Sequence, residues 1–204
     1  MTYQVKVESI VNHLYQKVEH NQDQLFLVLI GGCSRSGKSV LAETISERLD
    51  EIGVNNSVVE LDSWLIGADQ RKLQSAVLER YDGKAIVTSI NSLLYGETIF
   101  PPIYNVRTRT RFAERRKTGI RISSGVLIVE GVIALAIEPL VQAADLRLFV
   151  AISDVDRLRR LKYFYTNKKG LTLKESEEII QSREMEEVPF IKKTAKNSDV
   201  VVAD

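Results

Sequence analysis

The chain of 204 residues contains one cysteine, Cys33, and only two histidines, His13 and His20. A single cysteine cannot build a disulfide framework, and this fits a reducing compartment, so we expect a cytoplasmic protein. The shortage of both residue types also argues against a zinc site and against a Cys/His or Ser/His/Asp nucleophile.

Long apolar runs and a strong excess of one charge are missing as well. No apolar run approaches the roughly 20 residues that span a bilayer, and residues 1–8 lack the basic and apolar regions of a signal peptide. A formal net charge of +1 argues against a general nucleic-acid or membrane-surface role. We therefore expect neither a nucleic acid nor a membrane as partner, and the apolar content of 44% is typical of a globular domain.

What the chain does contain is a glycine-rich stretch behind an apolar run. Residues 32–39 match the phosphate-binding loop pattern G-x-x-x-x-G-K-[ST] at every fixed position. In such a loop, backbone N–H groups point at phosphate oxygens, Lys38 can reach the β- and γ-phosphates, and the Ser39 hydroxyl can hold Mg²⁺. The apolar run 25–30 before the loop and an apolar stripe at helical spacing over 41–49 supply the expected strand and helix.

The loop therefore predicts ATP and Mg²⁺ as cofactors. The residues expected to bind the nucleotide are Gly32, Cys33, Ser34, Arg35, Ser36, Gly37, Lys38, Ser39 and Val40. Cys33 reads as a small space-filling residue inside the loop, with redox control as the alternative.

Strand-length apolar runs alternate with helical patterns along the rest of the chain, which predicts a parallel sheet between two layers of helices. Expected strands cover 25–30, 57–61, 126–129, 146–152 and 200–202. Expected helices cover 4–20, 37–52, 69–80 and 84–95, a segment ending near 144, and two helices that begin at capping patterns at 153–156 and 172–175. Residues 106–121 read as a basic connector, and 165–171 as a polar break.

Acidic residues stand at or near the predicted strand ends, where open parallel sheets bind ligands. Glu130 directly follows a strand of four apolar residues, and an acid there is costly to bury unless it is used. We interpret it as a contact to Mg²⁺ or to a metal-bound water, with a structural ion pair as the alternative. Asp62 could accept the proton of an attacking hydroxyl or cap a helix, and the residues alone leave both open.

Several short elements along the chain share one order with a known family. They are the phosphate loop, Asp62-Ser63-Trp64, Tyr81-Asp82, Pro102-Ile103-Tyr104-Asn105, the segment 128–135 (I-V-E-G-V-I-A-L), Asp156-Arg157-Leu158-Arg159-Arg160 and the closing segment 192–201. With these elements the chain resembles the uridine kinase and phosphoribulokinase family of phosphate-loop kinases. The resemblance implies a P-loop NTPase fold of the nucleoside-kinase type, a three-layer α/β/α arrangement with a mainly parallel sheet. It further implies one kinase domain over 23–204 with a helical lid at about 157–175, preceded by an N-terminal helical extension at 1–22.

The resemblance also implies roles for the matched residues. Asp62 would be the general base, while Asp82 and Tyr104 would contact the acceptor. Glu130 and Ser39 would share the Mg²⁺ ion.

Cations of the lid would act on the transferring phosphoryl group. By the resemblance, Arg157 and Arg160, three residues apart on one helix, would reach that group, with Lys38 as a further catalytic cation. A solvated helix face is the alternative for the two arginines. Trp64, which follows the expected base in its element, is assigned to the acceptor pocket.

The chain departs from uridine kinases where those enzymes hold the nucleobase. Asn105 replaces an aspartate and Arg109 replaces a histidine that contacts the pyrimidine, while Phe164-Tyr165 and Lys169-Gly170 replace Arg-Asp and Arg-Gly in the lid. The part that transfers the phosphoryl group is retained better than the part that holds the base.

Three arginines alternate with threonine in the segment 107–111. If the segment is extended, Arg107, Arg109 and Arg111 share one face and suit a phosphate or a carboxylate. This suggests an acceptor that already carries negative charge and assigns Arg109 to it, although an exposed basic loop is an equally good interpretation.

The sequence therefore favours a small-molecule kinase that phosphorylates a hydroxyl, first of a nucleoside, with an anionic sugar phosphate as the alternative. A nucleotide-binding regulatory protein is the rival of another class, and a guanine-selective switch would need Asn-Lys-x-Asp, which 167–170 lacks. The resemblance also suggests a homo-oligomer, and the N-terminal helix would either cover the domain or form a subunit contact.

Overall fold

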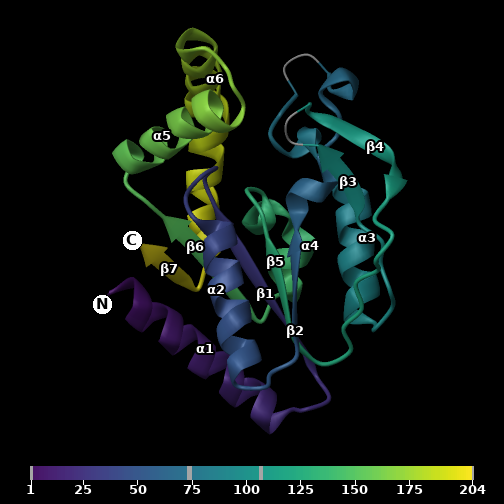
Figure 1. Cartoon of the computed structure of the whole chain (residues 1–204). Helices are drawn as coiled ribbons and strands as arrows, with labels where there is room; N and C mark the ends of the chain where they lie inside the picture. The colour runs from purple at the N-terminus through teal and green to yellow at the C-terminus, as the bar shows by residue number, and fades with distance from the viewer. Residues whose placement is uncertain (1, 73–74, 106–107, 204) are drawn as a thin grey trace.

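A five-stranded parallel sheet forms the centre of the molecule (Figure 1). The computed structural model describes residues 2–72, 75–105 and 108–203. The strands lie in the order β2-β5-β1-β6-β7, and each neighbouring pair is parallel. Their bounds are β1 Leu25–Gly32, β2 Asn56–Glu60, β5 Gly125–Glu130, β6 Leu146–Ala151 and β7 Val200–Ala203. The predicted three-layer fold and all five predicted strands are confirmed, with ends that shift by one or two residues.

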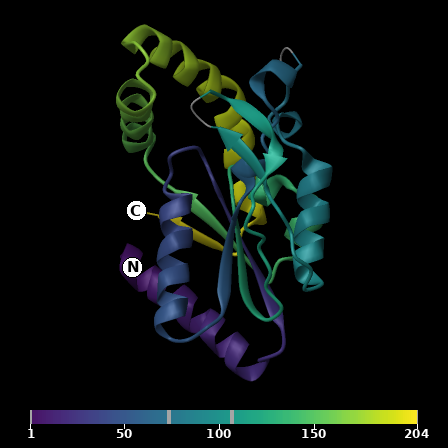
Figure 2. The same cartoon turned by 45° about the vertical axis from the view of Figure 1, so that its right-hand side comes forward.

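Helices cover both faces of this sheet, which is why β1 and β5 are continuous apolar runs buried along nearly their whole length. Figure 2 shows α1 and α2 on one side and α3 and α6 on the other. The bounds are α1 Tyr3–His20, α2 Lys38–Glu51, α3 Gly83–Leu94, α4 Glu138–Ala143, α5 Asp154–Tyr163 and α6 Leu173–Thr194.

Side chains alternate along the strands between two hydrophobic clusters, one on each face. Val28 and Ile30 of β1 pack with α1 and α2, whereas Leu27 and Leu29 face α3, α4 and α6. The helix predicted over 4–20 is α1. It buries Val7, Ile10, Val11 and Leu14 in the cluster that contains Val28 and Ile30. None of the helices in the described ranges has the length and apolarity needed to cross a membrane.

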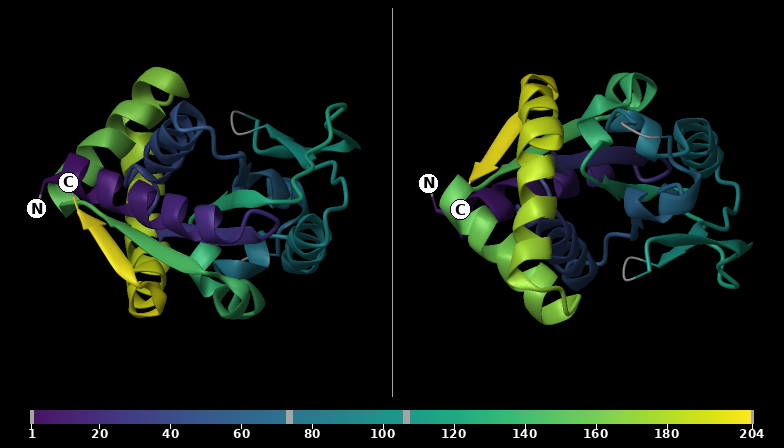
Figure 3. Two further views of the ribbon diagram at one scale, coloured as in Figure 1. Left: turned by 90° about the horizontal axis from the view of Figure 1, so that it is seen from below. Right: turned by 90° about the horizontal axis from the view of Figure 1, so that it is seen from above.

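We call α5, α6 and the π-helical turn Phe164–Lys168 the lid, because they contain most of residues 157–175, for which a helical lid is expected. The π-helical turn lies where a polar break was predicted. Both predicted caps exist: the Ser153 side chain accepts from the backbone N–H of Asp156, and Thr172 forms a complete capping box with Glu175. Figure 3 shows the lid and the hairpin of β3 and β4 on opposite sides of the molecule.

The hairpin was not predicted. Residues 106–121, read as a connector, contain β4 Thr110–Arg115, which pairs antiparallel with β3 Pro102–Asn105. Arg109 has a φ of 60° and lies in the turn before β4. The backbone is therefore not extended there, and the prediction that Arg109 and Arg111 share one face of an extended segment is wrong. Arg107, the first arginine of that segment, lies outside the described residues.

The helix predicted over 69–80 is also wrong. The described part of this segment holds two 3₁₀ turns, Ala68–Gln70 and Leu78–Arg80. A continuous helix does not form because the backbone groups at its ends form hydrogen bonds outside the segment. The N–H of Ile66 donates to the carbonyl of Arg80 (2.9 Å), and Leu65 and Tyr81 form an antiparallel bridge. The helix predicted to end near 144 is shorter than expected. The chain first forms a 3₁₀ turn at Ala134–Ala136, and α4 begins only at Glu138, with a proline in its first turn.

Candidate active site

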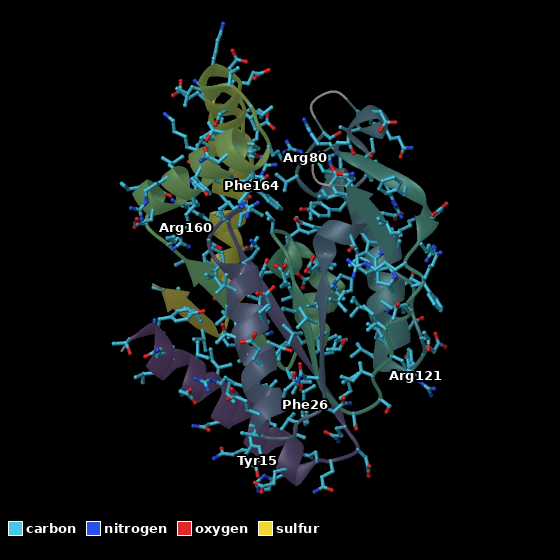
Figure 4. The ribbon with its side chains drawn as sticks, in the orientation of Figure 1. Tyr15, Phe26, Arg80, Arg121, Arg160 and Phe164 are labelled. Carbon is cyan, nitrogen blue, oxygen red and sulfur yellow. The ribbon has the colours of Figure 1, made fainter. Side chains whose placement is uncertain are left out.

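A cavity of ≈730 Å³ lies at the carboxyl ends of β1, β2 and β5. Its walls come from the phosphate loop, the turn after β2, the β3–β4 hairpin and the lid. Figure 4 shows Phe164 of the lid and Arg80 of the facing segment on either side of the opening.

The phosphate loop has the strained backbone that its sequence pattern requires. Gly32, Arg35 and Gly37 have φ values of 144°, 64° and 108°, and a Cβ atom at Gly32 would lie 2.6 Å from the carbonyl oxygen of Val150. The loop leads directly into α2, which begins at Lys38. Such a loop turns its N–H groups inward, and the helix adds its positive end, so these residues fit a triphosphate.

Six of the nine predicted nucleotide-binding residues line the cavity, and the other three do not. The lining residues are Ser34, Arg35, Gly37, Lys38, Ser39 and Val40. Gly32 is the last residue of β1, Cys33 is buried, and the Ser36 hydroxyl is buried without a hydrogen-bond partner among the described residues. The Lys38 ammonium is buried and donates to the Cys33 carbonyl (3.1 Å), which holds the side chain across its own loop.

The two predicted metal ligands are in direct contact. The Ser39 hydroxyl donates to Oε1 of Glu130 (2.9 Å), and Glu130 is buried at the end of β5. The described residues contain no group of three His, Cys, Asp or Glu side chains that could hold a metal alone. Oxygen ligands from one serine and one carboxylate suit Mg²⁺, which takes its other ligands from water and substrate phosphates.

Burial raises the pKa of Glu130 from 4.5 to about 7, and the negative charge of Asp62 adds to this, against the lowering effects of Lys38 and the Ser39 hydrogen bond. The folded protein therefore binds a proton at Glu130 more tightly than the unfolded chain does. Between pH 4.5 and 7 the free energy of unfolding falls as pH rises, since the folded state must give up this proton.

We therefore expect Glu130→Gln to stabilise the nucleotide-free protein at pH 8, by roughly 3 kcal/mol relative to its effect at pH 4.5. Urea denaturation at pH 4.5, 6 and 8 measures the difference. Glu138→Gln, on the exposed side of α4, is the control. If the difference in free energy of unfolding between Glu130→Gln and the wild type does not grow with pH, the raised pKa of Glu130 is contradicted.

Asp62 lies on the same side of the sheet as Glu130. It belongs to the 3₁₀ turn Leu61–Trp64 that follows β2, and Glu60 of β2 is in register with Glu130 of β5. Its carboxylate lines the cavity and accepts a hydrogen bond from the Tyr81 hydroxyl (3.2 Å). The two acids that the sequence singles out therefore converge on the phosphate loop.

Two predicted acceptor residues do not line this cavity. Trp64 is 1% exposed and packs in the core, because the turn that points Asp62 outward points Trp64 inward. Asp82 caps α3 by accepting from the N–H of Ala85 (3.2 Å), and its other oxygen pairs with Arg111 (3.2 Å). The capping alternative raised for Asp62 thus applies to Asp82.

The two lid arginines separate in the structure. Arg160 lines the cavity, whereas Arg157 is 1% exposed and lies against α6. Nη2 of Arg157 donates to both carboxylate oxygens of Glu184 (2.7 and 2.6 Å). Arg157 therefore does not reach the cavity, where the family resemblance places it. Its side of α5 packs against α6, whereas Arg159 and Arg160 face the cavity.

Tyr104 and Arg109 do line the cavity, and a residue that the sequence did not indicate joins them. Arg71 donates from Nη2 to the Tyr104 hydroxyl (3.1 Å) and from Nε to the Ile66 carbonyl (2.8 Å). No local pattern marks Arg71, since it lies within the segment 69–80, whose helical periodicity was misleading.

The lid touches the phosphate loop at two points, and neither was predicted. The Arg35 guanidinium lies 3.5 Å from the ring centroid of Phe164. Arg183 of α6 donates to the Ser34 hydroxyl (3.3 Å) and pairs with Glu187 (3.8 Å). Arg183 stands in a run of charged residues that looks like any solvated helix surface.

Cations dominate the cavity wall. Ten lysine and arginine side chains line it against three acidic ones. Burial lowers the pKa of Lys169, and the nearby charges of Arg183, Arg109 and Arg35 lower it further. The cavity is therefore built to receive anions.

Comparison with known proteins gives one consistent family. The model of the Phosphoribulokinase / Uridine kinase family matches residues 27–204. A uridine kinase of Shewanella oneidensis is 30% identical over 154 residues, which is 69% of each chain. The mouse protein uridine-cytidine kinase-like 1 is 28% identical over 148 residues, 68% of this chain, but the match spans only 26% of the mouse protein.

Solved structures share the fold at low sequence identity. A candidate fructose transport system kinase from a Silicibacter species superposes with a TM-score of 0.76 at 16% identity, covering 97% of both chains. D-glycerate 3-kinase from Cryptococcus neoformans gives a TM-score of 0.61 at 11% identity, covering 86% of this chain and 84% of that one.

Proposed function

The chain belongs to the phosphoribulokinase / uridine kinase family and is a small-molecule kinase, and we propose that it transfers the γ-phosphoryl group of ATP to a hydroxyl group. One observation carries this proposal. Lys38, Ser39, Asp62 and Glu130 come from three separate elements and gather in one cavity beside the phosphate loop. A protein that only binds a nucleotide has no need of Asp62 at this position.

In the proposed step the acceptor oxygen attacks the γ-phosphorus and forms the new P–O bond. Its proton passes to the carboxylate of Asp62, the bond to the β,γ-bridging oxygen breaks, and ADP leaves. Lys38 and Arg160 offset the charge that builds on the transferring group. Ser39 and Glu130 would hold Mg²⁺, which when bound supplies positive charge at the β- and γ-phosphates.

Most of the rate enhancement comes from holding the two reactants in line. Orientation of this kind contributes on the order of 7–11 kcal/mol to lowering the barrier. The lid helps by excluding water, which would otherwise take the phosphoryl group. The contacts of Phe164 with Arg35 and of Arg183 with Ser34 support a lid that closes directly on the phosphate loop.

Two classes of acceptor compete. The names of the bacterial relatives support a nucleoside. The cation-rich wall favours the second candidate, an acceptor that carries a phosphate or a carboxylate, because this wall holds more positive charge than a triphosphate with its Mg²⁺ neutralises. Arg71, which bonds Tyr104, and Arg109 both line the cavity and offer guanidinium groups to such an acceptor.

We expect ATP consumption to rise when one class of acceptor is added to the enzyme. The panel contains uridine, cytidine, nicotinamide riboside, pantothenate and ribulose 5-phosphate, with ADP release as the readout. A response to the anionic compounds alone supports the second candidate, and a response to the nucleosides alone supports the first. Absence of any response would favour a nucleotide-binding regulatory protein.

Arg109→Gln separates the two candidates further. If the acceptor is anionic, its KM rises roughly 10- to 100-fold, since a charge-assisted hydrogen bond is lost, while the KM for ATP stays the same. Arg121→Gln, whose side chain bonds the Gly96 carbonyl far from the cavity (Figure 4), is the control. An unchanged acceptor KM would remove Arg109 from the acceptor site.

Three further expectations stay predictions of the same proposal. They are the division into a helical extension at 1–22 and a kinase domain at 23–204, the cytoplasmic location and the homo-oligomer. Light scattering on the purified protein measures the last of these.

A further inference from the structure

The Tyr81 hydroxyl faces the carboxylate on which the proposed reaction depends. Tyr81 is 8% exposed, and its ring belongs to the core cluster that also contains Leu61 and Trp64. Its hydroxyl reaches the edge of the cavity and donates to Oδ1 of Asp62 (3.2 Å). A buried hydroxyl needs a hydrogen-bond partner, and here that partner is the proposed general base.

The backbone fixes the distance between these two residues. Leu65 and Tyr81 form an antiparallel bridge, with the N–H of Asp82 donating to the Trp64 carbonyl (3.0 Å) and the N–H of Ile66 to that of Arg80 (2.9 Å). The segment that carries Tyr81 is thus bonded to the residues that directly follow Asp62. The two side chains belong to one rigid unit although 19 positions separate them.

Tyr81 can act only as a donor in this pair. Burial and the neighbouring charges of Asp62 and Glu187 raise its pKa well above 10, so the hydroxyl keeps its proton at neutral pH. The bond to Oδ1 fixes the rotation of the carboxylate and leaves Oδ2 to receive the proton of the acceptor. Other charges near Asp62 are Arg35 of the phosphate loop, Glu130 of β5 and Arg183 of α6.

We propose that Tyr81 is a positioning residue, which orients Asp62 for proton abstraction through the hydrogen bond from its buried hydroxyl. This inference rests on the proposed function, because it assigns Tyr81 a role only through Asp62. It predicts an effect on turnover that disappears when Asp62 can no longer accept a proton.

The test is a double-mutant cycle with Tyr81→Phe and Asp62→Asn. Phosphoryl transfer from γ-labelled ATP is measured with water as acceptor, which needs no identified metabolite, and with uridine and ribulose 5-phosphate. Tyr81→Phe keeps the ring in the core and removes only the hydroxyl. We expect kcat to fall about tenfold with an unchanged KM for ATP, since one hydrogen bond to a charged group is lost.

In the Asp62→Asn background the same substitution is expected to change the residual rate by less than about twofold. Tyr15→Phe is the matched control, because that hydroxyl also donates to a carboxylate, Oε1 of Glu19, at 3.2 Å but lies on α1 away from the cavity. Thermal melting of each variant shows that the fold is retained.

Two results would overturn the positioning role: an unchanged kcat in Tyr81→Phe, or an equal loss in both backgrounds, which would mean that the hydroxyl acts independently of Asp62. Failure of the proposed function gives a different result. In that case Asp62→Asn by itself would leave the transfer rate unchanged.

Discussion

Replacing Asp62 by asparagine is expected to reduce phosphoryl transfer about 10³-fold, the contribution typical of a general base. The asparagine side chain has nearly the shape of the aspartate and can still accept from Tyr81, but it cannot take the proton of an attacking hydroxyl. Binding of ATP should stay the same, because the triphosphate is expected to lie against the loop around Lys38 and not against this turn.

Steady-state kinetics together with nucleotide titration by calorimetry check both parts of this expectation. Asp69→Asn is the control, since Asp69 is an exposed residue of a neighbouring turn that does not line the cavity. Loss of ATP binding in Asp62→Asn would point to a defect in the phosphate loop. Full activity would exclude Asp62 as the base.

Arg157→Met is expected to destabilise the protein by about 3 kcal/mol, the lower end of the range for breaking a buried ion pair. The Arg157 side chain is 2% exposed and holds both oxygens of Glu184, which is itself 29% exposed. Removing the guanidinium leaves a half-buried carboxylate without its partner. Partial exposure of Glu184 allows water to solvate it, which is why the lower value applies.

Urea denaturation of the nucleotide-free protein measures this loss, which corresponds to roughly 6–12 °C in Tm for a chain of this size. Arg159→Met is the control on the same helix, because Arg159 is 75% exposed and its pair with Asp156 contributes little. The double variant Arg157→Met/Glu184→Leu should recover part of the loss. Unchanged stability combined with lost transfer would return Arg157 to the catalytic role that the family resemblance implies.

Short-range patterns predicted the parts of this molecule that depend on neighbouring residues. The phosphate loop, the strand before it and the helix after it form one local unit whose backbone angles follow from its glycines. The helix caps at Ser153 and Thr172 are equally local: both side chains cap their helices as predicted, although only Thr172 forms a complete capping box. Buried parallel strands are recognisable because both of their faces are apolar.

The errors fall where distant residues compete for the same groups. The segment 69–80 has helical periodicity, but its ends bond to the turn after β2, and these long-range hydrogen bonds outweigh a weak local preference. The turn that places Arg109 needs a partner strand that the local sequence does not reveal.

The sequence by itself determined the phosphate loop, the five parallel strands and the two acids, Asp62 and Glu130, that meet at one edge of the sheet. These features follow from residue type, spacing and the rule that parallel strands end together. Only the tertiary structure decided that Arg157 is buried against Glu184, that Asp82 caps a helix and that Tyr81, Arg71 and Arg183 reach the site. The physical reason is that an arginine or a tyrosine has several partners within reach, and the packing of α5, α6 and the hairpin selects one.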